Sequence, residues 1–442
     1  MYRCTKCDAQ SLKWLGRCTE CSNWGTLVED GDASSSSVSR TARAKPAPTL
    51  NLSAASITTA EHRSSGISEL DRVLGGGIVP GSVTLLAGEP GVGKSTLVAQ
   101  IAAQQPSAAR SGQPRGVAPT ILSYYASGEE SEGQVLMRFK RLGLDPGSIA
   151  FSNAVEVGGI LAAARELKPS IVIVDSIQTM LLEDADALPG TPTAVRAATA
   201  EIISFAKSTG IAVLIIGQVT KDGNVAGPKT LEHLVDTVLT LEGDPDSSYR
   251  LLRAAKNRFG STEEVGVFEM TERGMIAVEN PSAMFLKERV PGPGSVVTCV
   301  MEGTRPFLVE IQALVDRSFF PNPVRRTSGY DASRLQMLLA IIGKRAGIKV
   351  YDQDVFVNVV GGMKVKEPAV DLAVAAAIIS AIENISLPED AIVLGELGLG
   401  GELRTVPFLE RRLKEAERLG LKSAITPKHI RHLNELAKHL AK

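Results

Sequence analysis

The sequence predicts an α/β protein whose nucleotide-binding core lies between a small metal-binding module and a larger C-terminal domain. A glycine-rich loop stands between a β-prone run and a helix at residues 82–100, the arrangement of a phosphate-binding loop. Apolar runs at residues 171–176 and 211–217 indicate strands buried on both faces, as in a parallel sheet. Two cysteine pairs precede this core within the first 21 residues. We therefore expect three modules in one chain.

Length, composition and charge narrow the class of protein. A chain of 442 residues predicts two or three domains of about 150 residues each. Hydrophobic residues make up 44% of the chain and charged residues 22%, which is typical of a soluble globular protein. Because the formal net charge is -1, a site for nucleic acid would have to be a local basic surface.

The chain carries no signal for secretion or membrane insertion. Its N-terminus has no apolar signal core, and its longest apolar stretch, residues 373–382, is shorter than the ~20 residues of a membrane span. Cys299 stands far from the other four cysteines, so their distribution does not indicate a disulfide framework. We expect a cytoplasmic protein that makes no membrane contact.

Residues 1–30 carry the spacing of a structural zinc site. Two C-x2-C pairs, separated by ten residues, can aim four thiolates at one Zn²⁺ ion: Cys4, Cys7, Cys18 and Cys21. With all four positions filled by protein, the metal would be structural and would supply most of the folding free energy of the segment. The alternatives are two redox-active pairs or a disulfide. We expect Trp14 and Trp24, which flank the second pair, to pack over the site.

Residues 31–60 predict a flexible linker because they are rich in Ser, Ala and Pro and poor in large apolar residues. The basic residues Arg40, Arg43 and Lys45 could contact a polyanion, although a solvated tether is the simpler explanation.

The phosphate-binding loop and the start of its helix supply the predicted ATP-binding residues, which are Gly88, Glu89, Pro90, Gly91, Val92, Gly93, Lys94, Ser95 and Thr96. Glycines let successive backbone N–H groups point at a phosphate, and the helix N-terminus adds its positive dipole end. Lys94 would reach the β and γ phosphates, and the Ser95 hydroxyl would bind Mg²⁺. The alternative is a glycine-rich turn that only links a strand to a helix.

Residues 66–77 carry the run Gly-Ile-x-Glu-Leu-Asp-x-x-Leu-Gly-Gly-Gly just ahead of this loop. That run resembles the RecA and KaiC branch of P-loop ATPases, which implies a RecA-like ATPase domain over residues 61–280. Glu129 matches the catalytic glutamate of the branch, with Glu130 as its neighbour or substitute. Carboxylates at the end of a strand beside the loop can orient the attacking water, although an ordinary acidic turn is the alternative for either residue.

The same resemblance assigns the following polar residues. Asp175 ends a Walker B strand and would hold the Mg²⁺ shell through water. Gln218, at the end of the next strand, would sense the γ-phosphate and connect to a mobile loop that faces DNA. Lys221 and Lys229 lie in that loop.

The stretch Lys256, Asn257, Arg258, Phe259 and Gly260 resembles a signature of the RadA family of bacterial DNA repair proteins, also called Sms. This family joins an N-terminal four-cysteine finger to a RecA-type core and a Lon-like C-terminal domain, so the resemblance runs through the whole chain. Two cations around an aromatic ring can neutralise a phosphate while the ring packs or stacks. That phosphate would belong to DNA or to the ATP of the neighbouring subunit. Taken alone, the stretch would be a basic turn.

Residues 281–442 resemble the proteolytic domain of the Lon peptidase, a family with a Ser nucleophile and a Lys base, chiefly at residues 356–382 and 395–427. The family's patterns place Ala369 at the nucleophile and Glu410 at the base. A methyl group cannot attack a carbonyl, so we expect an α+β domain that is inactive as a peptidase. By elimination it would serve assembly and DNA contact, with positive charge from Arg325, Arg326, Lys344, Arg345, Lys364 and Lys366. A solvated surface charge is the alternative for each.

The resemblance to RadA implies a function. It implies a DNA-stimulated ATPase, an ATP-driven motor in homologous recombination and repair that acts on single-stranded and branched DNA by branch migration or strand unwinding. It also implies a homo-oligomer, with a hexameric ring as the suggested form, and partners that include a recombinase and a replicative helicase. Two alternatives stay open: an ATP-dependent Lon-like peptidase and a KaiC-like ATP switch without motor activity.

Overall fold

The computed structural model describes residues 2–6, 10–11, 13–29, 62–104, 123–183, 188–218, 230–243 and 248–440. The chain divides into two compact units, Met1–Thr58 and Thr59–Lys442. The predicted linker 31–60, with Arg40, Arg43 and Lys45, lies outside the described residues, as do Cys7, Lys221 and Lys229.

The first unit is a three-stranded antiparallel sheet in the order β2-β1-β3. Its strands are β1 Tyr2–Cys4, β2 Gln10–Ser11 and β3 Leu27–Glu29. Cys4, Cys18 and Leu27 are buried at its centre. The expectation that Trp14 and Trp24 cover the cysteines is wrong. They are 61% and 76% exposed, and their rings lie against Gly16, where no side chain competes for the space.

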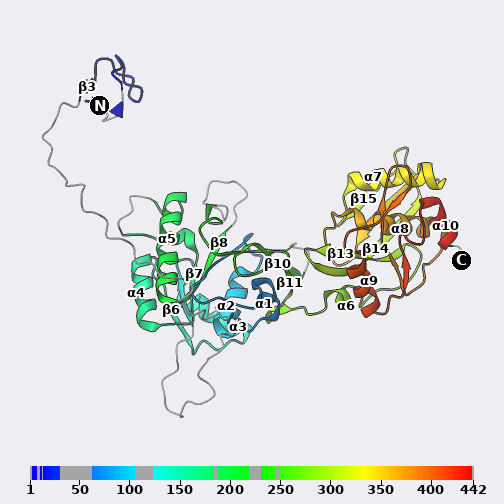
Figure 1. Cartoon of the computed structure of the whole chain (residues 1–442), viewed down its shortest axis with the longest axis horizontal. Helices are drawn as coiled ribbons and strands as arrows, with labels where there is room; N and C mark the ends of the chain where they lie inside the picture. Colours follow the sequence, from blue (N-terminus) through cyan, green and yellow to red (C-terminus); the bar gives the residue numbers. More distant parts are fainter. Residues whose placement is uncertain are drawn as a thin grey trace, which may run out of the picture. The chain divides into compact units, whose positions relative to one another are not determined.

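The second unit begins with a nine-stranded sheet, here called the core sheet, in the order β12-β11-β10-β9-β4-β8-β7-β5-β6 (Figure 1). The neighbouring strands β9, β4, β8, β7, β5 and β6 run parallel to one another. Strands β9, β10, β11 and β12 form an antiparallel meander. Their bounds are β4 Val83–Gly88, β5 Ser123–Ser127, β6 Ile149–Ser152, β7 Ile171–Asp175, β8 Ala212–Gln218, β9 Thr237–Glu242, β10 Tyr249–Asn257, β11 Val265–Thr271 and β12 Gly274–Ala277.

Two apolar clusters cover the two faces of the core sheet. One contains residues of α1 Ser68–Leu74, α2 Lys94–Gln104 and α3 Glu132–Leu142. The other contains residues of α4 Val157–Leu167 and α5 Pro192–Thr209 (Figure 1). Every residue of β4, β5 and β7 is buried, which is why these strands are nearly continuous apolar runs.

The parallel strands bring the predicted site residues to one edge of the core sheet. Gly88 at the end of β4 pairs with Gln218 at the end of β8, and Ser127 at the end of β5 pairs with Asp175 at the end of β7. Ligands of open α/β sheets bind outside this carboxyl edge. The fold therefore gathers segments that are more than 100 residues apart in sequence.

A second, four-stranded sheet follows, here called the C-terminal sheet, in the order β13-β14-β16-β15. Its strands are β13 Ser295–Glu302, β14 Arg305–Arg317, β15 Arg325–Ser328 and β16 Gln353–Val359. Four short strands make two small sheets, β17 Ala391–Val393 with β20 Ser423–Ile425 and β18 Glu396–Leu397 with β19 Leu403–Arg404. The helices are α6 Pro281–Phe285, α7 Ala332–Ile341, α8 Asp371–Glu383, α9 Leu409–Arg418 and α10 Leu433–Leu440.

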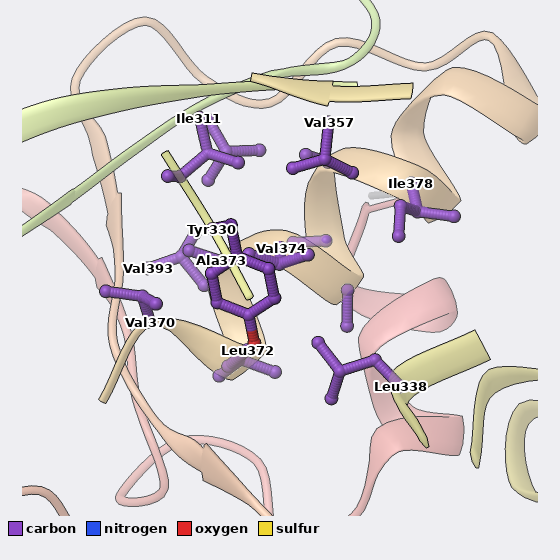
Figure 2. Close-up of a cluster of buried hydrophobic side chains, with 14 of the residues drawn as sticks. Ile311, Tyr330, Leu338, Val357, Val370, Leu372, Ala373, Val374, Ile378 and Val393 are labelled. Carbon is purple, nitrogen blue, oxygen red and sulfur yellow. The ribbon is translucent and has the colours of Figure 1, made fainter. Parts of the chain in front are cut away.

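Helix α8 is the centre of the C-terminal core. Its residues from Asp371 to Ser380 are all buried, so the longest apolar stretch of the sequence is a core helix. Figure 2 shows side chains of this cluster, including Ile311 and Val357 from the sheet and Val374 and Ile378 from α8. Within the part of the chain that the structure describes, no helix has the length and apolar composition of a membrane span.

The turn between β13 and β14 docks against the core sheet and α1. The Arg305 guanidinium pairs with Glu69 of α1, whose side chain is only 1% exposed. The Glu69 carboxylate also accepts a hydrogen bond of 2.9 Å from the backbone N–H of Val267 on β11. The backbone N–H of Thr304 donates to the Glu263 carbonyl at 2.9 Å. A buried ion pair and a backbone hydrogen bond thus join the two sheets.

Candidate active site

The phosphate-binding loop has the backbone that its glycines predict. Gly91 and Gly93 have φ angles of +77° and +112°, where other residues are strained. Lys94, the first residue of α2, is 7% exposed, and its ammonium donates to the carbonyls of Gly88 and Glu89, each at 2.9 Å. Burial lowers the pKa of Lys94, and the nearby Asp175 and Glu129 carboxylates act in the opposite direction. The loop thus holds one cation close to two carboxylates.

Asp175 is buried at the end of β7, as the sequence predicted for a Walker B carboxylate. It is 3% exposed, and the Tyr125 hydroxyl on β5 donates to its Oδ2 at 2.6 Å. Burial raises the pKa of Asp175 to about 6, although the hydrogen bond from Tyr125 acts to lower it. A buried carboxylate close to the Lys94 ammonium, with acceptor positions besides the one that Tyr125 occupies, fits a water-bridged Mg²⁺ site, because oxygen ligands are those that Mg²⁺ prefers.

Glu129 lies between two hydrogen-bond donors from neighbouring strand ends. The Gln218 side-chain amide donates to both of its carboxylate oxygens, at 2.9 and 3.1 Å, and the Ser176 hydroxyl donates to Oε1. Ser176 is fully buried and directly follows Asp175. The predicted water-orienting carboxylate and the predicted γ-phosphate sensor are therefore in contact.

Glu130 has a different environment from Glu129. Its carboxylate forms a two-pronged ion pair with Arg138 of α3, and its carbonyl accepts from the Asn153 side chain at 2.9 Å. Because both Glu130 carboxylate oxygens contact the guanidinium, fewer of their acceptor positions are left for a water molecule. This geometry favours Glu129 over Glu130 as the residue that orients water.

The stretch from Lys256 to Gly260 packs within its own chain. A β-bulge after Ala254 precedes Lys256, whose ammonium donates to the carbonyls of Glu232 at 2.7 Å and Val235 at 2.8 Å. The Asn257 amide donates to the carbonyls of Val73 and Leu74 at the end of α1, at 3.3 and 3.2 Å. Gly260 lies against Gly75, where an added Cβ would meet its Cα at 3.0 Å.

Arg258 and Phe259 carry the exposed side chains of that stretch. Arg258 pairs with Asp236 at 3.1 Å and keeps half of its side chain exposed, and Phe259 is 37% exposed. The two cations that the sequence treats alike thus differ in the structure: Lys256 holds the backbone of residues 232–235, and Arg258 faces outward.

The described cysteines form a cluster that fits a metal. The Sγ atoms of Cys4, Cys18 and Cys21 all lie within 4.8 Å of one another, and those of Cys4 and Cys21 are 3.6 Å apart. Tetrahedral Zn–S bonds of about 2.3 Å place two sulfurs about 3.8 Å apart, so the separation suits zinc.

The position at which the sequence comparison predicted a lost nucleophile, Ala369, is closed to solvent. Ala369 is 3% exposed and packs in an apolar cluster with Ile392, Leu394 and Leu409. Two residues before it, Glu367 pairs with Arg412 of α9, which is 1% exposed and also donates to the Cys299 carbonyl. An ion pair therefore sits beside the position where the peptidase family has its nucleophile.

The assignment of Glu410 to the base position is wrong. Counted from Pro407, the sixth residue of the pattern Pro-x-Gly-Gly-Leu-Lys is Arg412, and the structure agrees, because Glu410 is exposed whereas Arg412 reaches the Ala369 segment. The assignment placed the pattern two residues short, and residues two apart on α9 face different sides. Arg412 is a guanidinium, which stays protonated, so the absence of a peptidase base stays a prediction for that position too.

The six predicted cations of the C-terminal domain are exposed, as contact with a polyanion requires: Arg325, Arg326, Lys344, Arg345, Lys364 and Lys366. Lys364 and Lys366 line a cleft of about 560 Å³ together with Arg334, and Arg326 lines a separate one of about 620 Å³. The cations that line clefts are therefore divided between two separate clefts.

Sequence reasoning missed Tyr125, Ser176 and Arg138, each of which holds one of the predicted carboxylates. In the sequence, a Tyr within a buried strand indicates a core residue, and a Ser directly after a strand indicates a turn. A signal for Tyr125 was available, because a phenol in a buried strand usually has a hydrogen-bond partner.

Three family models match parts of the chain. Residues 46–224 match the family described as an AAA domain, residues 332–430 that described as subunit ChlI of Mg-chelatase, and residues 2–29 that described as a rubredoxin metal binding domain. A solved structure, the KaiC-like protein of Pyrococcus horikoshii OT3, superposes with a TM-score of 0.39 at 19% identity, covering 50% of this chain and 99% of that one.

Curated relatives match nearly the full chain. The DNA repair protein RadA of Pseudomonas aeruginosa is 46% identical over 430 residues, which cover 97% of this chain and 92% of that protein. RadA of Aquifex aeolicus is 44% identical over 431 residues, with 97% and 93% covered. The predicted fold class and resemblance are thereby confirmed, and the chain belongs to the RadA family of DNA repair proteins.

Proposed function

We propose that the protein is a DNA-stimulated ATPase that works as a motor in homologous recombination and DNA repair. Its substrates would be single-stranded and branched DNA, which it would process by branch migration or strand unwinding. Its relatives are DNA repair proteins by name, which supports the repair assignment, and the match of residues 46–224 to an AAA domain supports ATP hydrolysis. A recombinase and a replicative helicase are the proposed partners, and the cytoplasm is the proposed location.

The observation that carries this proposal is the contact between Glu129 and Gln218. Gln218 is the last described residue before segment 219–229, which holds Lys221 and Lys229, and its amide lies on the Glu129 carboxylate. A change in that segment on binding DNA would move Gln218 and so alter the carboxylate that orients water. Coupling between bound DNA and the Gln218–Glu129 contact is what DNA stimulation requires.

The ATP site is assigned to the phosphate-binding loop and the carboxylates beside it. Residues 88–96 would cradle the phosphates, with Lys94 exchanging the carbonyls of Gly88 and Glu89 for phosphate oxygens. Bound Mg²⁺ would neutralise phosphate charge, held by Ser95 and, through water, by Asp175. Glu129 would accept the proton of the attacking water, and Gln218 would leave Glu129 for the γ-phosphate.

The proposed DNA and subunit contacts use exposed groups. Arg258 and Phe259 stand exposed on the core, and six exposed cations stand on the C-terminal domain. We assign Arg258 to a phosphate, of DNA or of the neighbouring subunit's ATP, in a homo-oligomer for which a hexameric ring is the proposed form. Lys256 supports this role from inside the chain.

The peptidase alternative finds no support in the site. Ala369 has no nucleophilic atom, and Arg412 is a buried cation in an ion pair where the family needs a neutral amine. The KaiC-like switch can be distinguished from the motor by the effect of DNA on the ATP hydrolysis rate. The motor requires that DNA raise this rate, and the switch does not.

The test is the ATP hydrolysis rate of the full chain with and without single-stranded DNA. We expect stimulation by DNA, loss of turnover by a factor of about 10² to 10³ in Lys94→Ala, and loss of the DNA response in Gln218→Ala. A fluorescent three-strand substrate would report branch migration in the same samples. If neither single-stranded nor branched DNA changes the ATP hydrolysis rate at low salt, the motor proposal is wrong and the switch is favoured.

A further inference from the structure

Tyr125 is placed to control Asp175. It lies on β5, which is hydrogen-bonded to β7, and its side chain is 1% exposed. Its hydroxyl donates to Asp175 Oδ2 at 2.6 Å, a distance typical of a hydrogen bond to a charged carboxylate. Its ring packs in the cluster of α2 and α3 and contacts Phe151, with ring centroids 6.0 Å apart. The hydroxyl therefore has a fixed place.

That hydrogen bond limits the orientation of the Asp175 side chain. Within the described part of the chain, the Tyr125 hydroxyl is the group that donates to this carboxylate. A carboxylate has about four acceptor positions on two oxygens, so one bond fixes its plane and leaves positions for other donors. Residues that hydrogen-bond to a metal-binding side chain hold that side chain in the orientation that metal binding needs.

We propose that Tyr125 is a positioning residue for ATP hydrolysis, whose hydroxyl holds the Asp175 carboxylate ready for the water shell of Mg²⁺. The inference rests on the proposed role of Asp175. Tyr125 itself touches neither nucleotide nor metal and acts through Asp175. Arg138 and Glu130 form their ion pair close to it and keep α3 packed on the same side.

The neighbouring residue on β5 supplies a matched control. Tyr124 is 3% exposed, but its ring belongs to the cluster on the opposite face of the core sheet, with α4 and α5. Tyr124→Phe and Tyr125→Phe each remove one hydroxyl from the same strand. They differ in whether that hydroxyl serves Asp175.

The experiment measures binding of a fluorescent ADP analogue to the full chain as Mg²⁺ is titrated, and binding of Mn²⁺ by electron paramagnetic resonance. We expect Tyr125→Phe to raise the half-saturating metal concentration about tenfold, as for other groups that orient metal-site side chains. Nucleotide affinity in EDTA and the thermal unfolding midpoint should change little. Tyr124→Phe should match the wild type in all measurements.

Asp175→Asn separates the two ways in which the inference can fail. If Asp175→Asn shifts the metal dependence and Tyr125→Phe does not, Tyr125 is only a core residue. If Asp175→Asn has no effect, the proposed Mg²⁺ role of Asp175 fails and the inference falls with it. If the inference is right, adding Tyr125→Phe to Asp175→Asn changes the metal dependence no further, since the two residues act as one unit. Additive shifts would overturn it.

Discussion

Two adjacent glutamates at the end of β5 show how one residue's neighbours set its chemistry. Glu129 accepts from the neutral donors Ser176 and Gln218, whereas Glu130 is paired with Arg138. An amide and a hydroxyl orient the Glu129 carboxylate, whereas the Arg138 guanidinium occupies both oxygens of Glu130 in a two-pronged pair. The first can take part in proton transfer and the second is a structural group.

We predict that Glu129→Gln lowers ATP turnover by a factor of about 10² to 10⁴, the usual contribution of a general base. Glu130→Gln should keep turnover within severalfold of the wild type, because its loss affects the packing of α3 rather than the water. Steady-state ATPase rates of the two variants at saturating ATP, with equal nucleotide affinity as the control, check this. Equal losses in both variants would contradict the assignment.

The same residues show what the sequence could predict about the site. The strand-end positions of loop 88–95 and Asp175 were predictable from the phosphate-binding pattern and the buried apolar run, and that of Gln218 from the resemblance to RecA-like proteins. The choice between Glu129 and Glu130 was not, since it depends on Arg138, whose approach is set by the packing of α3. Arg412 could have been found in the sequence, because it is the sixth residue counted from Pro407, whereas its ion pair with Glu367 depends on the fold.

At the scale of elements, the buried parallel strands of the core sheet were predictable, and the antiparallel strands at one edge of that sheet were not. The runs at 171–176 and 211–217 became β7 and β8 because burial on both faces leaves an unbroken apolar signal. The meander β10 to β12 was not predicted, because its strands mix polar and apolar residues. Its bulge after Ala254 is the feature that aims Lys256 at the carbonyls of residues 232–235.

We predict that Lys256→Ala loosens the backbone of residues 230–236, because two carbonyls lose their donor. Hydrogen exchange of these amides should accelerate about tenfold or more, since each lost bond is worth about 1 kcal/mol. Arg258→Ala removes a half-exposed ion pair and should leave exchange there nearly unchanged, while reducing the salt slope of single-strand binding by about 0.7. Mass spectrometry and salt titrations separate the two; slow exchange in Lys256→Ala would refute the anchoring role.

The first unit makes an independent prediction about metal. One Zn²⁺ should bind per chain, and Cys4→Ser or Cys18→Ser should release it and disorder the three-stranded sheet, which has little apolar core of its own. Cys299→Ser, which changes the buried cysteine of β13, should retain the full zinc content. Elemental analysis of protein purified without chelator decides this, and a zinc content near zero in the wild type would exclude the site.

At the scale of the whole second unit, α1 connects its two sheets. On one side, Glu69 holds Arg305 from the turn between β13 and β14. On the other, the carbonyls of Val73 and Leu74, which the helix leaves unpaired, accept from Asn257 in the stretch that ends at Gly260. A seven-residue helix thus links the C-terminal sheet to the segment that carries Arg258.

The last prediction tests whether this docking contributes to stability. Gly303 in the turn and Gly347 elsewhere in the C-terminal domain have φ angles of +61° and +74°, so alanine costs about 1–2 kcal/mol at either. An added Cβ at Gly303 would stand 1.8 Å from the Glu263 carbonyl, whereas at Gly347 nothing lies within 4 Å. Gly303→Ala must therefore push the turn off the core and strain the pair of Glu69 with Arg305. We expect its free energy of unfolding in urea to fall by about 1–3 kcal/mol more than that of Gly347→Ala. Equal losses would mean that the turn does not dock in solution.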